Sequence, residues 1–254
     1  MRSLLTRRID EAFAPAPAPA PGRVAWLAER PYAHRGLHGE GRAENSLSAF
    51  RAAAAAGHGI ELDVRLSSDG FAIVFHDSAL DRLTGESGAL ADRSAAELGR
   101  IRLAGGEDRI PTLAEAVAAT NGVPLLIEIK TDDRHVSRLC HAVRRAVEGQ
   151  AERVAIMSFH PEVPRWFAAH ARHIVRGLVV SESGKGWRGP IAGRLALWRG
   201  KPEFLAYDVR DLPSRFAAAQ RARGLPLLTW TCRSGEERAR AGRHADQIVY
   251  ETGA

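Results

Sequence analysis

Strand-like apolar runs alternate with helix-length, alanine-rich stretches over most of this chain. The alternation predicts a parallel sheet, because parallel neighbours need a crossover of roughly a dozen residues or more, usually a helix. SLSAFRAAAAAG and HVSRLCHAVRRAVEG carry Gly at their ends, which is typical of helix termination. Nine runs are predicted as strands, at about residues 31–35, 59–66, 71–76, 124–130, 154–159, 174–180, 204–209, 226–232 and 246–250.

The second and third runs are joined by a connection too short for a parallel crossover. SSDG is a tight turn, so residues 59–66 and 71–76 are predicted to form an antiparallel hairpin. Eight strands then remain, and a chain of 254 residues is long enough for one barrel of eight strands. The predicted fold is therefore an α/β, TIM-type (β/α)8 barrel with an antiparallel hairpin and a small helical insertion.

The barrel domain is predicted over residues 31–254, after an N-terminal arm and Ala/Pro linker at residues 1–30. Residues 14–22 alternate Ala and Pro and are expected to be extended and semi-rigid. The insertion is predicted at about residues 77–109, a stretch too long for an ordinary connection. We expect it to lie over the mouth of the barrel, because active sites of such barrels lie at the C-terminal strand ends.

The predicted hairpin brings acidic groups and an imidazole together. Glu61 and Asp63 are two residues apart on one strand, so their side chains point to the same face. Folding about the SSDG turn is expected to place His76 roughly opposite Glu61. Two carboxylates and an imidazole that converge in this way can hold a divalent cation and move a proton.

Two other segments carry comparable groups. YAHRG delivers His34 and Arg35 into a Gly, and LLIEIK carries Glu128 and Lys130 on one face of an apolar strand. These charges would be costly to bury unless they bind a metal, each other or a charged ligand. With the hairpin residues they supply three carboxylates, two imidazoles, a guanidinium and an ammonium. That set suits metal-assisted cleavage of a phosphodiester.

Each segment alone has a simpler structural explanation. The HRG segment also suits a turn in which the His is bonded to the backbone. Glu61 and Asp63 also suit a buried ion pair with Arg65, and Lys130 suits a counter-ion for Glu128. Chance explains the three segments together less well, so the functional interpretation is preferred.

The chain resembles the glycerophosphodiester phosphodiesterase family in its bacterial cytosolic form. The resembling stretches follow the family order from residue 33 to about residue 233, and they are AHRGLHGEGRAENSLSAFRAA, GIELDVRLSSDGFAIVFHDSALDRLTGESGAL, RIPTLAEAV, PLLIEIK, IMSFHP and LLTWTCR. The resemblance implies a TIM-type barrel with one divalent metal ion, Mg²⁺ or Ca²⁺. It also implies hydrolysis of a small-molecule glycerophosphodiester to glycerol 3-phosphate and an alcohol.

Carried over residue by residue, the resemblance implies a pair of catalytic histidines, three metal ligands and five substrate-binding residues. The histidines are His34 and His76. The metal ligands are Glu61, Asp63 and Glu128. The substrate-binding residues are Arg35 and Lys130 on the phosphate, Glu44 beside Arg35 or the ion, and Phe159 and Trp230 in the pocket.

Two positions depart from the broader family pattern. Cys232-Arg233 stands after the TWT strand where many relatives have Asn, and Glu251 stands where an Asp-Pro ending is common. Neither is expected to touch the metal or the histidines. Both bear on the alcohol side of the pocket, where Arg233 is expected to influence the ranking of head groups.

The segment SESGKGWRGPIAGRLALWRGKP begins with glycines and continues with apolar residues at helical spacing. Ile191, Leu195 and Trp198 predict an amphipathic helix that packs on the barrel. The alternative is a lid whose Lys185 or Arg188 meets the substrate head group.

Composition bears on partners and location. The net charge is +6, but the basic residues are interleaved with Glu, as in ERARAGRHA, and show no pattern that predicts nucleic-acid binding.

The N-terminal segment lacks a signal-type apolar core, and no stretch reaches the length of a membrane span. Cys140 and Cys232 form no CxxC pair and indicate a reducing compartment or buried thiols. We expect a cytoplasmic monomer or homodimer without stable membrane association.

Two other functions remain open from the sequence. A lysophospholipase D-like phosphodiesterase acting on lysophospholipids would share the barrel and metal site. It would need a broad apolar groove, whereas the loops are polar and rich in Gly. A catalytically inactive, phosphodiester-binding barrel is the second alternative, and the presence of every inferred catalytic residue argues against it.

Overall fold

Eight parallel strands form a closed barrel in the computed structural model, which describes residues 16–39, 41–120, 122–131, 136–183 and 188–251. The barrel strands are β1 (Tyr32–His34), β2 (Gly59–Leu66), β4 (Leu125–Ile129), β5 (Val154–Ser158), β6 (Val175–Val180), β7 (Phe204–Asp208), β8 (Leu227–Cys232) and β9 (Gln247–Tyr250). Their order is β1-β9-β8-β7-β6-β5-β4-β2, and β1 pairs with β2 to close the ring. The predicted eight-stranded parallel barrel is confirmed.

A further strand, β3 (Ala72–Val74), pairs antiparallel with β2. Val64 lies opposite Val74, a register one residue away from the expected one that set His76 opposite Glu61. The turn holds five residues rather than four, because Ser67 and Phe71 hydrogen-bond across it: the Ser67 amide donates to the Phe71 carbonyl, and the Phe71 amide donates to the Ser67 hydroxyl.

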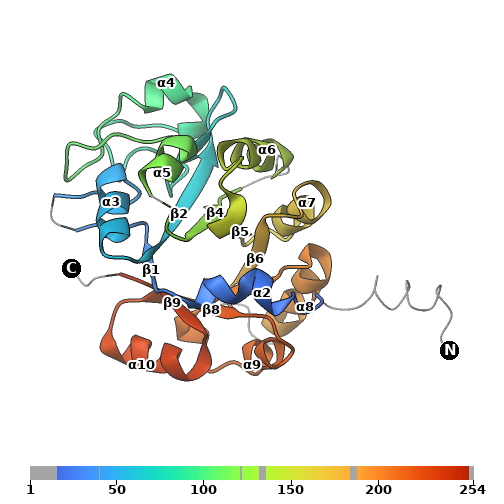
Figure 1. The fold of residues 1–254 in the computed structure, drawn as a ribbon. Helices are drawn as coiled ribbons and strands as arrows, with labels where there is room; N and C mark the ends of the chain where they lie inside the picture. Colours follow the sequence, from blue (N-terminus) through green and yellow to red (C-terminus); the bar gives the residue numbers. More distant parts are fainter. Residues whose placement is uncertain (1–15, 40, 121, 132–135, 184–187, 252–254) are drawn as a thin grey trace.

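Helices surround the strands in chain order, from α3 (blue) to α10 (red) in Figure 1. Their bounds are α3 (Leu47–Ala55), α5 (Leu113–Ala119), α6 (Val136–Ala146), α7 (Glu162–His170), α8 (Arg188–Gly200), α9 (Arg215–Ala222) and α10 (Gly235–His244). The 3₁₀ turns η3 (Ala151–Arg153) and η4 (Val209–Asp211) lie in connections. Ser46, Thr112 and Ser234 cap the first turns of α3, α5 and α10 by accepting a backbone N–H. None of the described helices has the length and apolar character needed to cross a membrane.

Alternate residues of the barrel strands belong to two different apolar cores. Leu62 of β2 and Ile127 of β4 pack in the layer between strands and helices, together with Phe50 of α3. Leu126, the neighbour of Ile127, instead belongs to a second cluster with Phe204. Because side chains alternate faces along a strand, the acids at positions 61, 63 and 128 point the same way as Leu126, toward the barrel interior.

The segment before β1 packs against the barrel interior. It consists of α2 (Pro21–Val24) and η1 (Ala25–Ala28). Leu27 is fully buried and shares the interior cluster with Phe204. The extended linker predicted for residues 14–22 is wrong at Pro21 and Gly22, which begin α2, since Pro is well suited to the first position of a helix. Residues 1–15, the first half of the predicted arm, lie outside the described residues.

Residues 77–109 contain two short helical elements, η2 (Leu90–Asp92) and α4 (Ala95–Leu98). Leu80, Leu90 and Leu98 share one buried cluster with Ile73 and Phe75 of the hairpin. The segment therefore rests on the hairpin and is held by its own small core.

The packed face predicted for α8 is wrong. Leu195 is 62% exposed and Trp198 is 39% exposed, whereas Leu197 is buried in a cluster with Leu178 and Tyr207 of the barrel. Leu197 lies about 200° around the helix from Leu195, so a different stripe faces the barrel. Lys185 lies outside the described residues, as do the side chains of Arg188 and Ile191.

Candidate active site

Three carboxylates meet inside the barrel near the C-terminal ends of two neighbouring strands. Glu61 and Asp63 lie on β2, and Glu128 lies on β4 directly beside Asp63 in the parallel register. One carboxylate oxygen from each residue lies within 4.8 Å of the other two, and all three residues are buried. The structure therefore brings the three predicted metal ligands together.

The three acids differ in how readily they ionise. Burial, with the charges of Asp63 and Glu128, raises the pKa of Glu61 well above its usual value. Burial also raises the pKa of Glu128, although Lys130 opposes the shift. Burial acts to raise the pKa of Asp63 too, but Lys130 and Arg35 lower it to about 2. The three carboxylates carry more negative charge than Arg35 and Lys130 neutralise, and this excess favours the binding of a further cation.

Glu61 gives the clearest sign that a ligand belongs in this cluster. Its Oε1 atom is buried and has no hydrogen-bond partner among the described residues, while Oε2 accepts a hydrogen bond from the Arg35 amide at 3.2 Å. Leaving a buried polar atom unpaired costs about 1–3 kcal/mol. Carboxylate oxygens are the donors that Mg²⁺ and Ca²⁺ prefer, so the donor set fits a hard divalent cation.

Two basic side chains contact the carboxylate cluster. Lys130 Nζ lies 2.7 Å from Glu128 Oε1 and 3.2 Å from Asp63 Oδ1. Arg35 Nε lies 3.1 Å from Asp63 Oδ2. Lys130 is thus a counter-ion for Glu128, as the simpler interpretation expected, and it also binds Asp63. Both predicted phosphate contacts stand directly beside the predicted metal ligands.

The turn after β1 explains how Arg35 reaches two acids. Its backbone is in the left-handed region, with φ of 55°, which is uncommon for a residue other than Gly. Its amide points at Glu61 while its side chain points at Asp63. Gly36 follows with φ of 81°, and a Cβ there would lie 2.9 Å from the backbone carbonyl carbon of Ala49. The HRG segment is therefore both a tight turn and a carrier of site residues.

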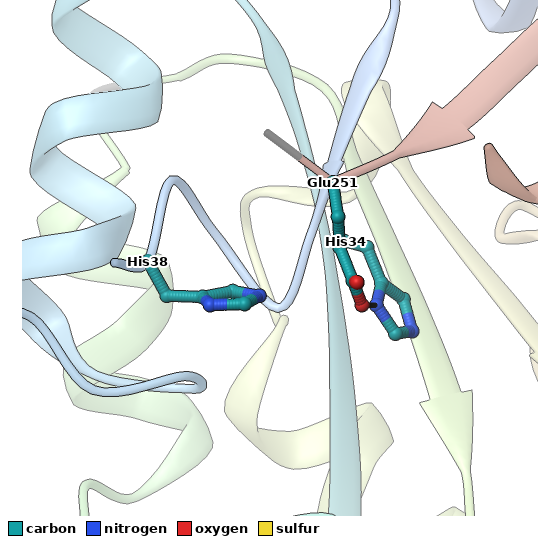
Figure 2. A group of neighbouring side chains, drawn as sticks. All are labelled: His34, His38 and Glu251. Carbon is teal, nitrogen blue, oxygen red and sulfur yellow. Dashed lines mark hydrogen bonds and ion pairs between the residues drawn. The ribbon is translucent and has the colours of Figure 1, made fainter. Parts of the chain in front are cut away.

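His34 lies between the carboxylate cluster and the end of β9. Its Nε2 is 3.9 Å from Glu61 Oε2, and its Nδ1 is 2.5 Å from Glu251 Oε1 (Figure 2). Burial lowers the pKa of His34, although the hydrogen bond with Glu251 opposes the shift. The expectation that Glu251 touches neither histidine is wrong. Ala33 pairs with Tyr250 in the parallel register, so the next residues of the two strands, His34 and Glu251, arrive side by side.

His76 is held in a similar way, by a carboxylate that an arginine binds. Its Nδ1 lies 2.6 Å from Asp77 Oδ1, and Arg82 Nε donates to Asp77 Oδ2 at 2.6 Å. Burial lowers the pKa of His76, against the charge of Asp63. The His76 charge in turn helps to lower the pKa of Asp63, so this imidazole acts electrostatically on the cluster. Arg65 Nε donates to the His76 carbonyl oxygen at 2.7 Å.

The AENS segment supplies two further neighbours. Glu44 Oε1 accepts hydrogen bonds from Arg35 Nη1 and Arg82 Nη2, both at 2.7 Å. Asn45 Nδ2 donates to Asp63 Oδ2 at 3.0 Å, and its φ is 56°. Neither Asn45 nor Arg82 is predicted from the sequence. The position of Asn45 beside Glu44 is a signal that could identify it, whereas Arg82 lies in the insertion and carries no comparable signal.

Two aromatic side chains meet at the mouth of the barrel. Phe159 follows β5 and Trp230 lies on β8, and their rings meet edge to face with centroids 5.7 Å apart. Phe159 is 46% exposed. It lines a pocket at the ends of β4 and β5 together with Glu128 and Lys130. The pocket therefore places Phe159 beside Glu128 of the carboxylate cluster.

The chain matches a family model described as the glycerophosphoryl diester phosphodiesterase family over residues 34–246. It is 30% identical over 215 residues to the probable glycerophosphodiester phosphodiesterase 2 of Mycobacterium tuberculosis, which covers 82% of this chain and 73% of that protein. It is 37% identical over 114 residues to rat glycerophosphodiester phosphodiesterase 1, which covers 39% of this chain and 34% of that protein. The matched region thus spans 34% of the length of the rodent relatives.

A solved structure of an Oleispira antarctica phosphodiesterase in complex with the product sn-glycerol-3-phosphate has the same fold. Its TM-score is 0.75 at 24% identity, with 89% of this chain and 94% of that chain covered. The family match runs from the end of β1 to the residue before β9 and so includes both histidines and all three clustered carboxylates. The chain belongs to the glycerophosphoryl diester phosphodiesterase family.

Proposed function

We propose that this protein hydrolyses glycerophosphodiesters to glycerol 3-phosphate and an alcohol with the help of one divalent cation. The observation that carries the proposal is the buried Glu61 Oε1 atom, which has no partner among the described residues although it sits in a cluster of three acids. Two histidines and two basic side chains border the same cluster. Family membership supports the substrate class.

Glu61, Asp63 and Glu128 would hold the cation, which is Mg²⁺ or Ca²⁺. When bound, it supplies positive charge that polarises the phosphoryl group and stabilises the charge developing on its oxygens. Arg35 and Lys130 would bind non-bridging phosphate oxygens from the same side. A guanidinium has five N–H donors, so the ion pairs of Arg35 with Glu44 and Asp63 leave donors for the phosphate.

His34 is suited to take a proton from the nucleophile. An ionised carboxylate only accepts hydrogen bonds, so His34 Nδ1 must donate to Glu251. In the neutral ring, Nε2 then carries the lone pair, and Nε2 is the atom near Glu61. Because burial lowers the His34 pKa, the ring is neutral and able to act as a base. Water and the glycerol hydroxyl of the substrate are both suitable nucleophiles for this step.

His76 is suited to protonate the leaving alcohol. Its side chain is 31% exposed, against 12% for His34, so it can exchange protons with solvent more easily. Burial lowers the His76 pKa, but the charge of Asp63 and the hydrogen bond from Nδ1 to Asp77 oppose that shift and favour the protonated ring that an acid requires. The proton would pass from His76 Nε2 to the alcohol oxygen as the phosphorus–oxygen bond breaks.

Removing the metal tests the proposal directly. We expect the purified protein to hydrolyse glycerophosphocholine, glycerophosphoethanolamine and glycerophosphoinositol, EDTA to abolish turnover, and added Mg²⁺ or Ca²⁺ to restore it. Glu61→Gln should weaken metal binding measured by isothermal titration calorimetry, because it removes one charged ligand. Glu107→Gln is the matched control, since the Glu107 side chain is 84% exposed and pairs with Arg102.

Two results would contradict this function. Full turnover by metal-free protein would exclude the metal role, and unchanged metal affinity in Glu61→Gln would exclude the proposed ligands. A lysophospholipid in the same panel tests the lysophospholipase D-like alternative. Metal binding without turnover of any phosphodiester would instead indicate a binding barrel.

A further inference from the structure

We infer that Glu251 and Arg233 are positioning residues, which hold the imidazole of His34 in the orientation and tautomer that proton transfer requires. The inference rests on the proposed function, in which His34 Nε2 accepts a proton. It concerns two residues outside the metal cluster, one at the end of β9 and one at the end of β8.

Glu251 is bound from two sides by its side-chain oxygens. Oε1 lies 2.5 Å from His34 Nδ1 and also accepts from Arg233 Nη2 at 3.1 Å. Oε2 accepts from Arg233 Nε at 2.6 Å. The Arg233 guanidinium therefore donates to both oxygens of the Glu251 carboxylate, and this bidentate geometry fixes the plane of the carboxylate. Burial acts to raise the Glu251 pKa, but the hydrogen bonds from His34 and Arg233 lower it to about 2, so the group stays ionised.

The three members of this chain come from adjacent strands. β9 lies between β1 and β8 in the barrel, so Glu251 stands between His34 and Arg233. The backbone around Arg233 is also held, because its amide donates to Glu237 Oε2 at 2.7 Å in the capped first turn of α10. Such support leaves the imidazole little freedom to rotate, which is the condition for efficient proton transfer.

The same arrangement occurs at the other histidine. Arg82 donates to Asp77, and Asp77 binds Nδ1 of His76. Each histidine thus has a carboxylate on Nδ1 and an arginine on that carboxylate. Three strand ends supply the residues around His34, whereas the single stretch after β3 supplies those around His76. In both cases Nε2 is the nitrogen left to act on the substrate. The repetition favours a role in the reaction over an incidental ion pair.

A second metal site is the main alternative at this position. His34, His38 and Glu251 each place one potential ligand atom within 4.8 Å of the others, and the His38 ring points toward the pair in Figure 2. Ligand bonds of about 2.0–2.2 Å in tetrahedral geometry separate two donor atoms by more than about 3 Å. The 2.5 Å between His34 Nδ1 and Glu251 Oε1 is instead a hydrogen-bond distance. The Arg233 guanidinium also already neutralises the carboxylate.

This geometry changes what is expected of Arg233. Arg233 and Glu251, both expected from the sequence to lie on the alcohol side of the pocket, bind each other. Arg233 should therefore affect the rate for all head groups alike through His34, rather than their ranking.

The test is steady-state kinetics on the metal-loaded enzyme with several glycerophosphodiesters. Glu251→Ala should lower kcat by about 10- to 100-fold, the range typical of partners that orient a functional histidine, with KM and metal affinity changed less than about twofold. Arg233→Ala should lower kcat in the same direction for every head group, and Arg233→Lys should recover part of the loss. Glu236→Gln, a change on the exposed face of α10, is the control and should leave kcat unchanged.

A double-mutant cycle separates positioning from a general structural effect. If Glu251 acts through His34, Glu251→Ala should cost nothing further in a His34→Ala background. An equal fractional loss in both backgrounds would overturn the inference. So would a changed ranking of head groups in Arg233→Ala, or loss of one bound metal ion per chain in Glu251→Ala.

A readout without turnover keeps this inference separate from the proposed function. In ¹H NMR, the proton shared by His34 Nδ1 and Glu251 should give a downfield resonance, identified by its absence from His34→Ala. It should disappear in Glu251→Ala and persist in Glu236→Gln. A wild-type protein that hydrolyses no glycerophosphodiester but shows this resonance would refute the function alone. An active wild type whose resonance survives Glu251→Ala would refute the positioning role alone.

Discussion

Asp63 is the residue on which the charges of the site converge. It forms ion pairs with Lys130 and Arg35 and accepts a hydrogen bond from Asn45 Nδ2, and these contacts lower its pKa to about 2 despite complete burial. Glu61, only two residues away, lacks comparable partners, and its pKa is raised. Two neighbouring acids on one strand face therefore differ because one is surrounded by cations and the other is not. A cation that binds Glu61 Oε1 would remove that difference.

Single substitutions of the histidines test their roles at the residue scale. His34→Ala and His76→Ala should each lower kcat by roughly a hundredfold or more, the contribution typical of acid–base catalysis. The free energy of unfolding should change little, because neither side chain belongs to the apolar cores of the barrel. Kinetics and urea denaturation of the two variants provide the measurements. A variant that keeps near-normal kcat would remove its histidine from the mechanism.

The sequence predicts residues of the site where a strand period places them, and fails where strands from distant parts of the chain meet. Spacing of two residues suffices to put Glu61 and Asp63 on one face. The contact of His34 with Glu251 joins residues 217 positions apart and depends on the β1–β9 register, which no local pattern contains. Arg82 is likewise visible only after the insertion has folded back to Glu44.

At the scale of elements, the turn from β1 to α3 is tightly constrained. It must present His34, reverse at Arg35 with φ of 55°, and then pass Ala49 closely enough that only Gly fits at position 36. The sequence predicted neither the length of the hairpin turn nor the packed face of helix α8. Side-chain hydrogen bonds lengthened the turn by one residue, and the packing of Leu197 selected a helix face that spacing alone did not identify.

Gly36→Ala tests this turn. A Cβ would lie 2.9 Å from Ala49 backbone and side-chain carbon atoms, in a conformation that disfavours side chains, so unfolding free energy should fall by about 1–3 kcal/mol. Activity should fall as well, because the strain displaces His34 and Arg35. Gly242→Ala in α10 has open space around its Cβ and should raise stability by about 0.5–1 kcal/mol. Equal stability of the two variants in urea denaturation would refute the steric argument.

At the scale of the whole molecule, one end of the barrel carries the candidate site and the other end contributes to stability. The C-terminal strand ends carry the charged site, and residues at the opposite end support the structure, as is general for this fold. The segment of α2 and η1 extends the interior core with Val24, Trp26 and Leu27. Arg23 Nε of the same segment lies 2.6 Å from Oε1 of Glu203, the residue just before β7. The barrel is thus completed by residues that the sequence pattern assigned to an arm outside it.

Leu27→Ala tests whether this segment belongs to the barrel. Leu27 is fully buried in the interior cluster, so truncating it should leave a cavity and lower the free energy of unfolding by about 2–5 kcal/mol. Leu195→Ala makes the same chemical change at a side chain that is 62% exposed, and such surface changes are usually within about 0.5 kcal/mol. Urea denaturation of both variants, followed by circular dichroism, gives the comparison. Because the site lies at the other end of the barrel, kcat of folded Leu27→Ala should stay near the wild-type value. Equal midpoints for the two variants would mean that residues 21–28 only rest on the barrel and do not stabilise it.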